Sequence, residues 1–209
     1  WKAANPNLIN FSGDAYKEEM GITSPGWKRD KDGRSIAEEN PPQGNAALLA
    51  HNPVTSPNEP DLEDVIAFAD FMRFLAPPPR GPINANVNAG EKVFTNIGCV
   101  NCHTSSLTTG TNAVAALNLK TFAPYSDFLI HDMGSLGDGI EQGTARGTEM
   151  RTAPLWGLRT QPNLLHDGRA KSIEEAIQLH RGQGQTAADR FRTLSTTDKA
   201  NLLAFLRSL

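Results

Sequence analysis

The chain has 209 residues, a formal net charge of −3 and 38% hydrophobic residues. This length is enough for a buried core, in one large domain or two small ones. The slightly acidic balance gives no indication of nucleic-acid binding, and no apolar run is long enough to predict a membrane span. With 18 Gly, 14 Pro and a mean hydropathy of −0.41, we expect short helices joined by long, ordered loops.

The first 60 residues have little periodicity and repeatedly place Pro beside Asn or Ser, which is typical of turns. They do not begin with the pattern of a secretory signal peptide. One short helix is predicted at 12–20, ended by Gly21. The region either wraps over a partner surface or forms ordered loops on the chain's own core. We interpret His51 as an exposed loop histidine rather than an iron ligand.

Residues 61–75 predict an amphipathic helix, because their apolar residues recur at spacings of three and four. Three consecutive prolines, 77–79, end this helix, and 77–82 has the composition of a linker. We therefore predict an irregular N-terminal region at 1–80, with its helix at about 61–75, and a second domain at 81–209.

The second domain begins with a predicted helix at 88–98, capped by Asn88 and ended by Gly98. It leads directly into Cys-Val-Asn-Cys-His at 99–103, which contains both cysteines of the chain. Cysteines at i and i+3 followed by histidine are the attachment signature of a c-type haem. The spacing brings Cys99 and Cys102 to one face, where each thiol can form a thioether with a porphyrin vinyl group, and His103 can be the proximal ligand.

Three other interpretations of this motif are weaker. A zinc site needs further ligands, and no second cysteine pair exists. A thioredoxin-like motif would follow a strand, and nothing before Asn88 resembles one. A disulfide between Cys99 and Cys102 is geometrically poor at this spacing. One covalent haem c also implies assembly on the exported side of a membrane, so we expect a periplasmic or extracellular protein.

The rest of the chain alternates loops and two capped helices. Residues 104–124 predict loops over a haem edge. Ser172 and Ser195 each begin a capping box and predict helices at about 172–181 and 197–208. We expect the last helix to cross the helix before Cys99. The expected fold class is mainly α: a cytochrome c-like helical domain with long ordered loops, plus an irregular N-terminal extension.

The second axial ligand of the iron decides the chemistry, because methionine raises the reduction potential and an open face admits small ligands. Met133 lies between an aspartate and a glycine, in polar surroundings that are unusual for a core methionine. We therefore predict His103 and Met133 as the metal ligands. Other candidates were Met150, His131 and His166, and we assign His180 a structural or exposed role.

Four segments after the cysteine motif carry a family resemblance, at 125–127, 131–134, 151–158 and 165–170. Together with Trp1-Lys2-Ala3 and residues 20–23, they resemble di-haem oxidoreductases related to bacterial cytochrome c peroxidases, and in particular their C-terminal haem domain. The resemblance implies an electron-entry haem with His103 and Met133 as its axial pair, and it allows a calcium ion nearby. It also relates Trp1 to a tryptophan that lies between the two haems of the family.

The chain departs from this family in one respect, since it contains a single Cys-x-x-Cys-His. The second haem would then belong to another part of the protein, or to a redox partner. We expect electron transfer by one haem. A peroxidase-like catalytic subunit or fragment and a structural haem module of a larger assembly are the alternatives. No catalytic acid or base is assigned, and Glu141 and Glu149 are interpreted as exposed loop acids.

Overall fold

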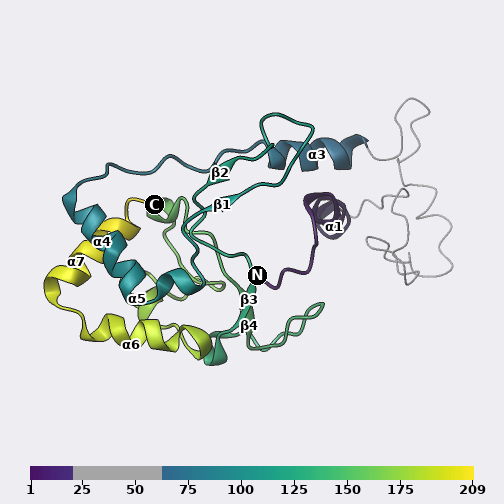
Figure 1. The fold of residues 1–209 in the computed structure, drawn as a ribbon. Coiled ribbons are helices and arrows are strands. Elements are labelled where there is room, and N and C mark those ends of the chain that lie inside the picture. Colours follow the sequence, from purple (N-terminus) through teal and green to yellow (C-terminus); the bar gives the residue numbers. More distant parts are fainter. Residues whose placement is uncertain (21–62) are drawn as a thin grey trace. The chain divides into compact units, whose positions relative to one another are not determined.

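The computed structural model describes residues 1–20 and 63–209. The chain forms two compact units: a larger one from Trp1–Ala4 and Pro77–Leu209, and a smaller one from Asn5–Ala76. The fold is mainly helical, as predicted, and it also contains a few short strands (Figure 1). The elements of the smaller unit are α1 (Leu8–Met20) and α3 (Glu63–Arg73); those of the larger unit are α4 (Ala85–Asn96), η1 (Cys99–Asn101), β1 (Leu107–Thr108), β2 (Thr121–Phe122), β3 (Ile130–Asp132), η2 (Gly134–Leu136), β4 (Glu149–Arg151), η3 (Leu158–Thr160), α5 (Ile173–Gln178), η4 (Gly182–Gly184), α6 (Gln185–Thr193) and α7 (Thr196–Leu206).

Helices α1 and α3 pack against each other in the smaller unit. The rings of Tyr16 and Phe68 meet edge to face, with centroids 6.2 Å apart. Helix α1 begins four residues before the predicted start, because the Asn7 side chain accepts a hydrogen bond from the Asn10 N–H. Ser12 instead lies inside the helix and donates to the Leu8 carbonyl. His51 lies outside the described residues.

The core of the larger unit forms between α4 and α7, which cross as predicted. Gly90 makes this close approach possible, since a Cβ there would lie 2.0 Å from the Asn201 carbonyl oxygen. Helix α4 begins earlier than predicted, and its N-cap is Asn84 rather than Asn88. Gly98 ends it with a left-handed φ of +94°, which is the expected role of a glycine there. Buried members of this core are Val87, Phe94, Ile97, Tyr125, Phe191, Leu202, Phe205, Leu206 and Leu209.

The C-terminal helices follow the predicted caps, with one addition. Ser172 and Ser195 accept hydrogen bonds from the backbone N–H groups of Glu175 and Asp198, and α5 and α7 begin directly after them. Helix α5 ends at Gln178, before the predicted end at 181. Helix α6, whose sequence begins with Gln-Thr-Ala-Ala, was not predicted.

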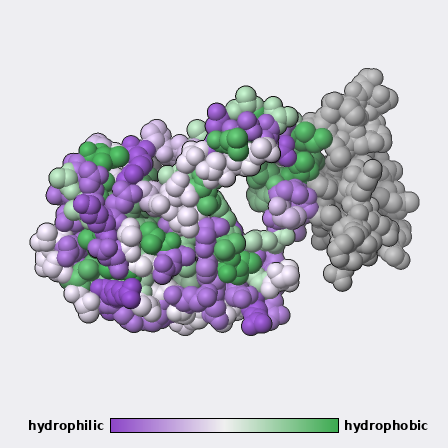
Figure 2. Space-filling model, viewed as in Figure 1, coloured by the Kyte–Doolittle hydropathy of each residue, from purple (hydrophilic) through white to green (hydrophobic). Residues whose placement is uncertain are grey.

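Two pairs of short antiparallel strands complete the larger unit: β1 with β2, and β3 with β4. In the second pair Ile130 is opposite Arg151, and His131 is opposite Met150. On the face shown in Figure 2, apolar residues of this unit form small separate groups among polar ones. Among the described residues, no helix combines the length and hydropathy that a membrane crossing requires.

Candidate haem-attachment site

The cysteine motif forms a single tight turn at the end of α4. The η1 turn follows Gly98, and the His103 N–H donates to the Cys99 carbonyl at 2.9 Å. Cys99 and Cys102 are both half-buried free thiols, so the disulfide interpretation finds no support here. Burial raises the pKa of Cys99 to about 12, which keeps its thiol protonated. The turn therefore presents two unoxidised thiols and a histidine within five residues.

The His103 imidazole is half-buried and held in one tautomer. Its Nδ1 lies 2.8 Å from the Tyr125 carbonyl oxygen, which can only accept, so Nδ1 carries the proton. Burial lowers the pKa of His103 to about 4, and the ring is therefore neutral at physiological pH. Nε2 is left with its lone pair available, which is the state that a metal ligand requires.

His180 has the same arrangement and lies beside His103. Its Nδ1 donates to the Ala176 carbonyl at 2.8 Å, and burial lowers its pKa. The two imidazole centroids are 6.5 Å apart. Two neutral histidines, each with Nδ1–H committed to the backbone, therefore lie side by side. Our interpretation of His180 as structural or exposed missed this proximity.

The glycines that follow His180 in the sequence were the feature that could have indicated its position near the site. A Cβ on Gly182 would lie 2.3 Å from the Asp132 carbonyl oxygen, and Gly182 has a left-handed φ of +54°. Glycines at such positions allow close backbone approach. They bring the segment after His180 against the segment that carries Met133.

Met133 lies directly before η2 and is half-buried. A Cβ on Gly184 would be 3.2 Å from the Met133 methyl carbon and 3.1 Å from His180 Cδ2. Met133 and His180 are therefore neighbours around Gly184, and His180 is in turn a neighbour of His103. Met150 is buried in β4.

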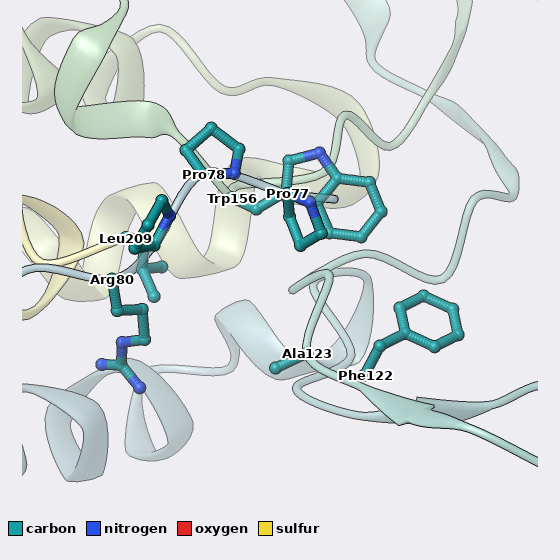
Figure 3. A pocket seen from close by; sticks show the side chains of 8 residues that line it. Pro77, Pro78, Arg80, Phe122, Ala123, Trp156 and Leu209 are labelled. Atoms are coloured by element: carbon teal, nitrogen blue, oxygen red, sulfur yellow. The ribbon is translucent and has the colours of Figure 1, made fainter. Parts of the chain in front are cut away.

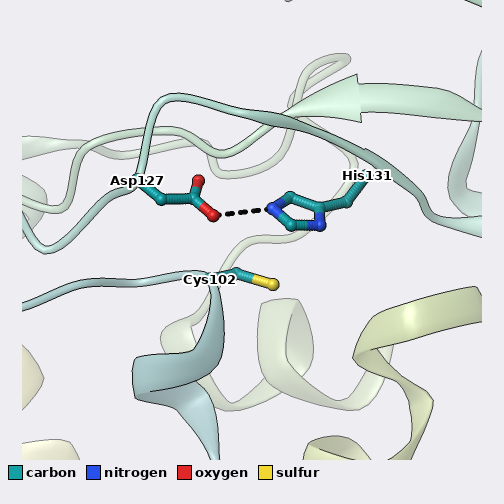
Figure 4. A group of neighbouring side chains, drawn as sticks. All are labelled: Cys102, Asp127 and His131. Carbon is teal, nitrogen blue, oxygen red and sulfur yellow. Dashed lines mark hydrogen bonds and ion pairs between the residues drawn. The ribbon is translucent and has the colours of Figure 1, made fainter.

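His131 belongs to a cluster with Cys102 and Asp127 (Figure 4). Its Nε2 lies 2.8 Å from Asp127 Oδ2, and the potential ligand atoms of all three residues lie within 4.8 Å of one another. Burial acts to raise the pKa of Asp127, but hydrogen bonds from the Leu129 N–H and His131 prevail and lower it. The Asp127 N–H also donates to the Cys102 carbonyl, so this cluster fastens the 125–127 segment to the cysteine turn.

Comparison with models of protein families gives one match. The family model described as "Di-haem oxidoreductase, putative peroxidase" matches residues 1–209. The chain belongs to the di-haem oxidoreductase family. No curated protein matches it.

Among solved structures, this di-haem oxidoreductase chain is similar to hydrazine synthase from Kuenenia stuttgartiensis, determined under xenon pressure. The TM-score is 0.50 and the identity is 17%, over 69% of this chain and 55% of the other. At this identity the likeness concerns the fold alone. The chain spans about half the length of that relative.

Trp1 and Lys2 of this di-haem oxidoreductase chain lie beside β4. The Arg151 N–H donates to the Trp1 carbonyl at 2.8 Å, and the Trp1 and His166 rings meet edge to face with centroids 6.3 Å apart. Lys2 is buried and donates to the Glu149 carbonyl at 2.8 Å. It also pairs with Asp138 at 2.7 Å.

Among the described residues, neither Glu141 nor Glu149 makes a hydrogen bond to a histidine. Glu141 is exposed, and the Glu149 carboxylate accepts from the Arg146 N–H at 2.7 Å. Glu141 is the exposed loop acid that we expected. Glu149 is instead half-buried in β4, so the same expectation was wrong for it.

A separate apolar pocket lies at the C-terminal end of α7 (Figure 3). Its volume is about 290 Å³, and none of the predicted haem-binding residues (Cys99, Cys102, His103 and Met133) lines it. In Figure 3 the Arg80 guanidinium points away from Trp156. The lining residues are Pro77, Pro78, Pro79, Arg80, Phe122, Ala123, Trp156 and Leu209.

Proposed function

We propose that this chain carries one haem c, attached through Cys99 and Cys102, with His103 as the proximal ligand, and that it transfers electrons. The observation that supports this most is the state of His103: half-buried, neutral and held by the Tyr125 carbonyl, with Nε2 available. Both thiols are free on the adjacent turn. This donor set suits a covalent haem. Such a haem would supply a one-electron carrier, whose potential the surrounding protein sets.

Two side chains compete for the other axial position. Met133 is the ligand predicted from the sequence, and a His–Met pair raises the potential. The second candidate is His180, which is favoured by its 6.5 Å distance from the His103 ring and by its matching hydrogen bond to a backbone carbonyl. A bis-histidine pair lowers the potential relative to His–Met. Because the two candidates are neighbours, replacing each one separately distinguishes them.

The family membership and the single motif together suggest how the chain works. We propose that it is the C-terminal, electron-entry haem domain of a di-haem oxidoreductase, and that a second haem domain or a redox partner protein exchanges electrons with it. Covalent haem attachment supports a periplasmic or extracellular location.

Catalysis is the second candidate function, because the description of the family includes peroxidase activity. Peroxide would then react at a haem whose distal face is open. His180 adjoins His103 and Met133 adjoins His180, so a second ligand is available, which supports electron transfer at this haem. Peroxide would then react at a second haem.

Absorption spectroscopy combined with intact mass measurement tests the proposal. We expect one haem per chain that survives acidic acetone extraction, with a low-spin spectrum that is unchanged by carbon monoxide after reduction. A chain purified after expression with a haem-attachment system but lacking haem would contradict the proposal. Rapid carbon monoxide binding with peroxide turnover would favour catalysis at this haem.

A further inference from the structure

Tyr125 connects His103 to a charged network at the opposite end of its own side chain. Its carbonyl accepts the His103 Nδ1–H at 2.8 Å, and its hydroxyl donates to Glu91 Oε1 at 2.7 Å. The residue is 3% exposed. One buried residue therefore joins the candidate iron ligand, through its backbone carbonyl, to a carboxylate on α4, through its hydroxyl.

Arg80 also contacts the phenol group of Tyr125. It donates to the Ser208 hydroxyl at 3.0 Å and, more weakly, to the Tyr125 hydroxyl at 3.4 Å. Its guanidinium carbon lies 5.8 Å from the Tyr125 ring centre and 5.5 Å from that of Phe205, within the range of cation–π attraction. Arg80 and Glu91, with opposite charges, thus meet at one hydroxyl group.

The backbone of Tyr125 is held in an unfavourable conformation. Its φ is +49°, in the left-handed region that a residue with a Cβ seldom adopts. The ring is fixed by edge-to-face packing on Phe94 and Phe205, with centroids 6.0 and 5.4 Å away. This conformation directs the Tyr125 carbonyl at His103, so the anchors of the ring also determine where that carbonyl lies.

We propose that Arg80, Tyr125 and Glu91 form a positioning network for His103. By fixing the Tyr125 carbonyl, the network fixes the tautomer and orientation of the imidazole and makes Nε2 a better electron donor to iron. It thereby stabilises the ferric state and lowers the reduction potential. This inference rests on the proposed function, since it takes His103 as an iron ligand.

The test uses haem-loaded Tyr125→Phe protein, which loses only the hydroxyl. Nuclear magnetic resonance of the reduced, low-spin protein measures deuterium exchange of the His103 Nδ1–H relative to the backbone amides of α7. We expect this relative exchange to be about fivefold faster, as for the loss of one ordinary hydrogen bond, together with a rise in reduction potential. Tyr16→Phe, which removes the same group from the smaller unit, should change neither quantity.

Glu91→Gln keeps the shape of the acceptor and weakens it, so it should move the exchange ratio in the same direction by a smaller factor. An unchanged ratio in Tyr125→Phe would overturn the network. Equal acceleration of the α7 amides would also overturn it, because general destabilisation would then explain the result. A wild-type protein without haem, or without His103 on the iron, would instead overturn the proposed function, and this inference would fall with it.

Discussion

The imidazole rings of His103 and His180 lie 6.5 Å apart, and each donates its Nδ1–H to a backbone carbonyl 2.8 Å away. Tyr125 supplies one carbonyl and Ala176 supplies the other. Neutral histidines whose Nδ1–H is occupied in this way are prepared to bind metal through Nε2. The second axial ligand of the proposed haem therefore has two candidates, Met133 and His180, which experiments can distinguish.

The identity of the second axial ligand is tested with the variants His180→Ala and Met133→Ala. If His180 binds iron, only its replacement should convert the haem from low-spin to high-spin, and the reduced protein should gain carbon monoxide binding. If Met133 binds, the wild-type ferric spectrum should show the weak long-wavelength band of methionine ligation, and Met133→Ala should remove it. Retention of a low-spin haem in both variants would mean that neither side chain is the ligand.

The two thioether bonds are tested with single cysteine variants. Cys99→Ser and Cys102→Ser should each retain haem through one bond, with a red-shifted alkaline pyridine spectrum, because one vinyl group remains unsaturated. The double variant should lose all haem on acidic acetone extraction. Covalent haem in the double variant would refute attachment at this motif.

Because α4 and α7 cross closely at Gly90, we expect that adding one methyl group there strongly destabilises the fold. An alanine in place of glycine normally stabilises a helix by about 1 kcal/mol. At Gly90, however, the new Cβ would lie 2.0 Å from the Asn201 carbonyl oxygen. We therefore expect Gly90→Ala to lower the free energy of unfolding by about 3 kcal/mol in a denaturant titration.

Gly110→Ala is the matched control for this variant. A Cβ at Gly110 would have no atom within 4 Å. The expected change in the free energy of unfolding is less than about 0.5 kcal/mol. A similar loss of stability in both variants would show that helix crossing is not the cause.

The Lys2–Asp138 ion pair predicts a pH-dependent contact. The hydrogen bond and charge of Lys2 hold the pKa of Asp138 below its ordinary value. A carboxyl whose folded-state pKa is depressed stabilises the fold above its ordinary pKa, and that contribution is lost as the pH falls through the depressed value. In Lys2→Met we expect the pKa of Asp138 to rise toward the ordinary value in a carboxyl-carbon resonance titration. The exposed Lys120→Met variant should leave it unchanged.

Local signals in the sequence predicted much of the fold. The serines at 172 and 195 start helices because their hydroxyls accept from N–H groups three residues ahead. The glycine at 98 ends α4, as its position after an apolar helix indicates. Asn88 was the wrong cap because Asn84 makes the same contact one turn earlier and extends α4.

Contacts between distant segments explain what the sequence did not reveal. His180 adjoins His103 because Gly182 and Gly134 allow two loops to meet. No local sequence pattern predicts this contact between the two loops. The strands of two or three residues were missed for a similar reason, since each depends on its partner rather than on its own sequence. Iron ligation by Met133 stays a prediction, with His180 as the alternative ligand.

The larger unit is discontinuous in the chain, because residues 5–76 separate its first four residues from the rest. Trp1 and Lys2 precede their partners Arg151 and Glu149 by almost 150 positions in the sequence. Pairing between such remote segments forms slowly. The edge beside β4 should therefore close late during folding.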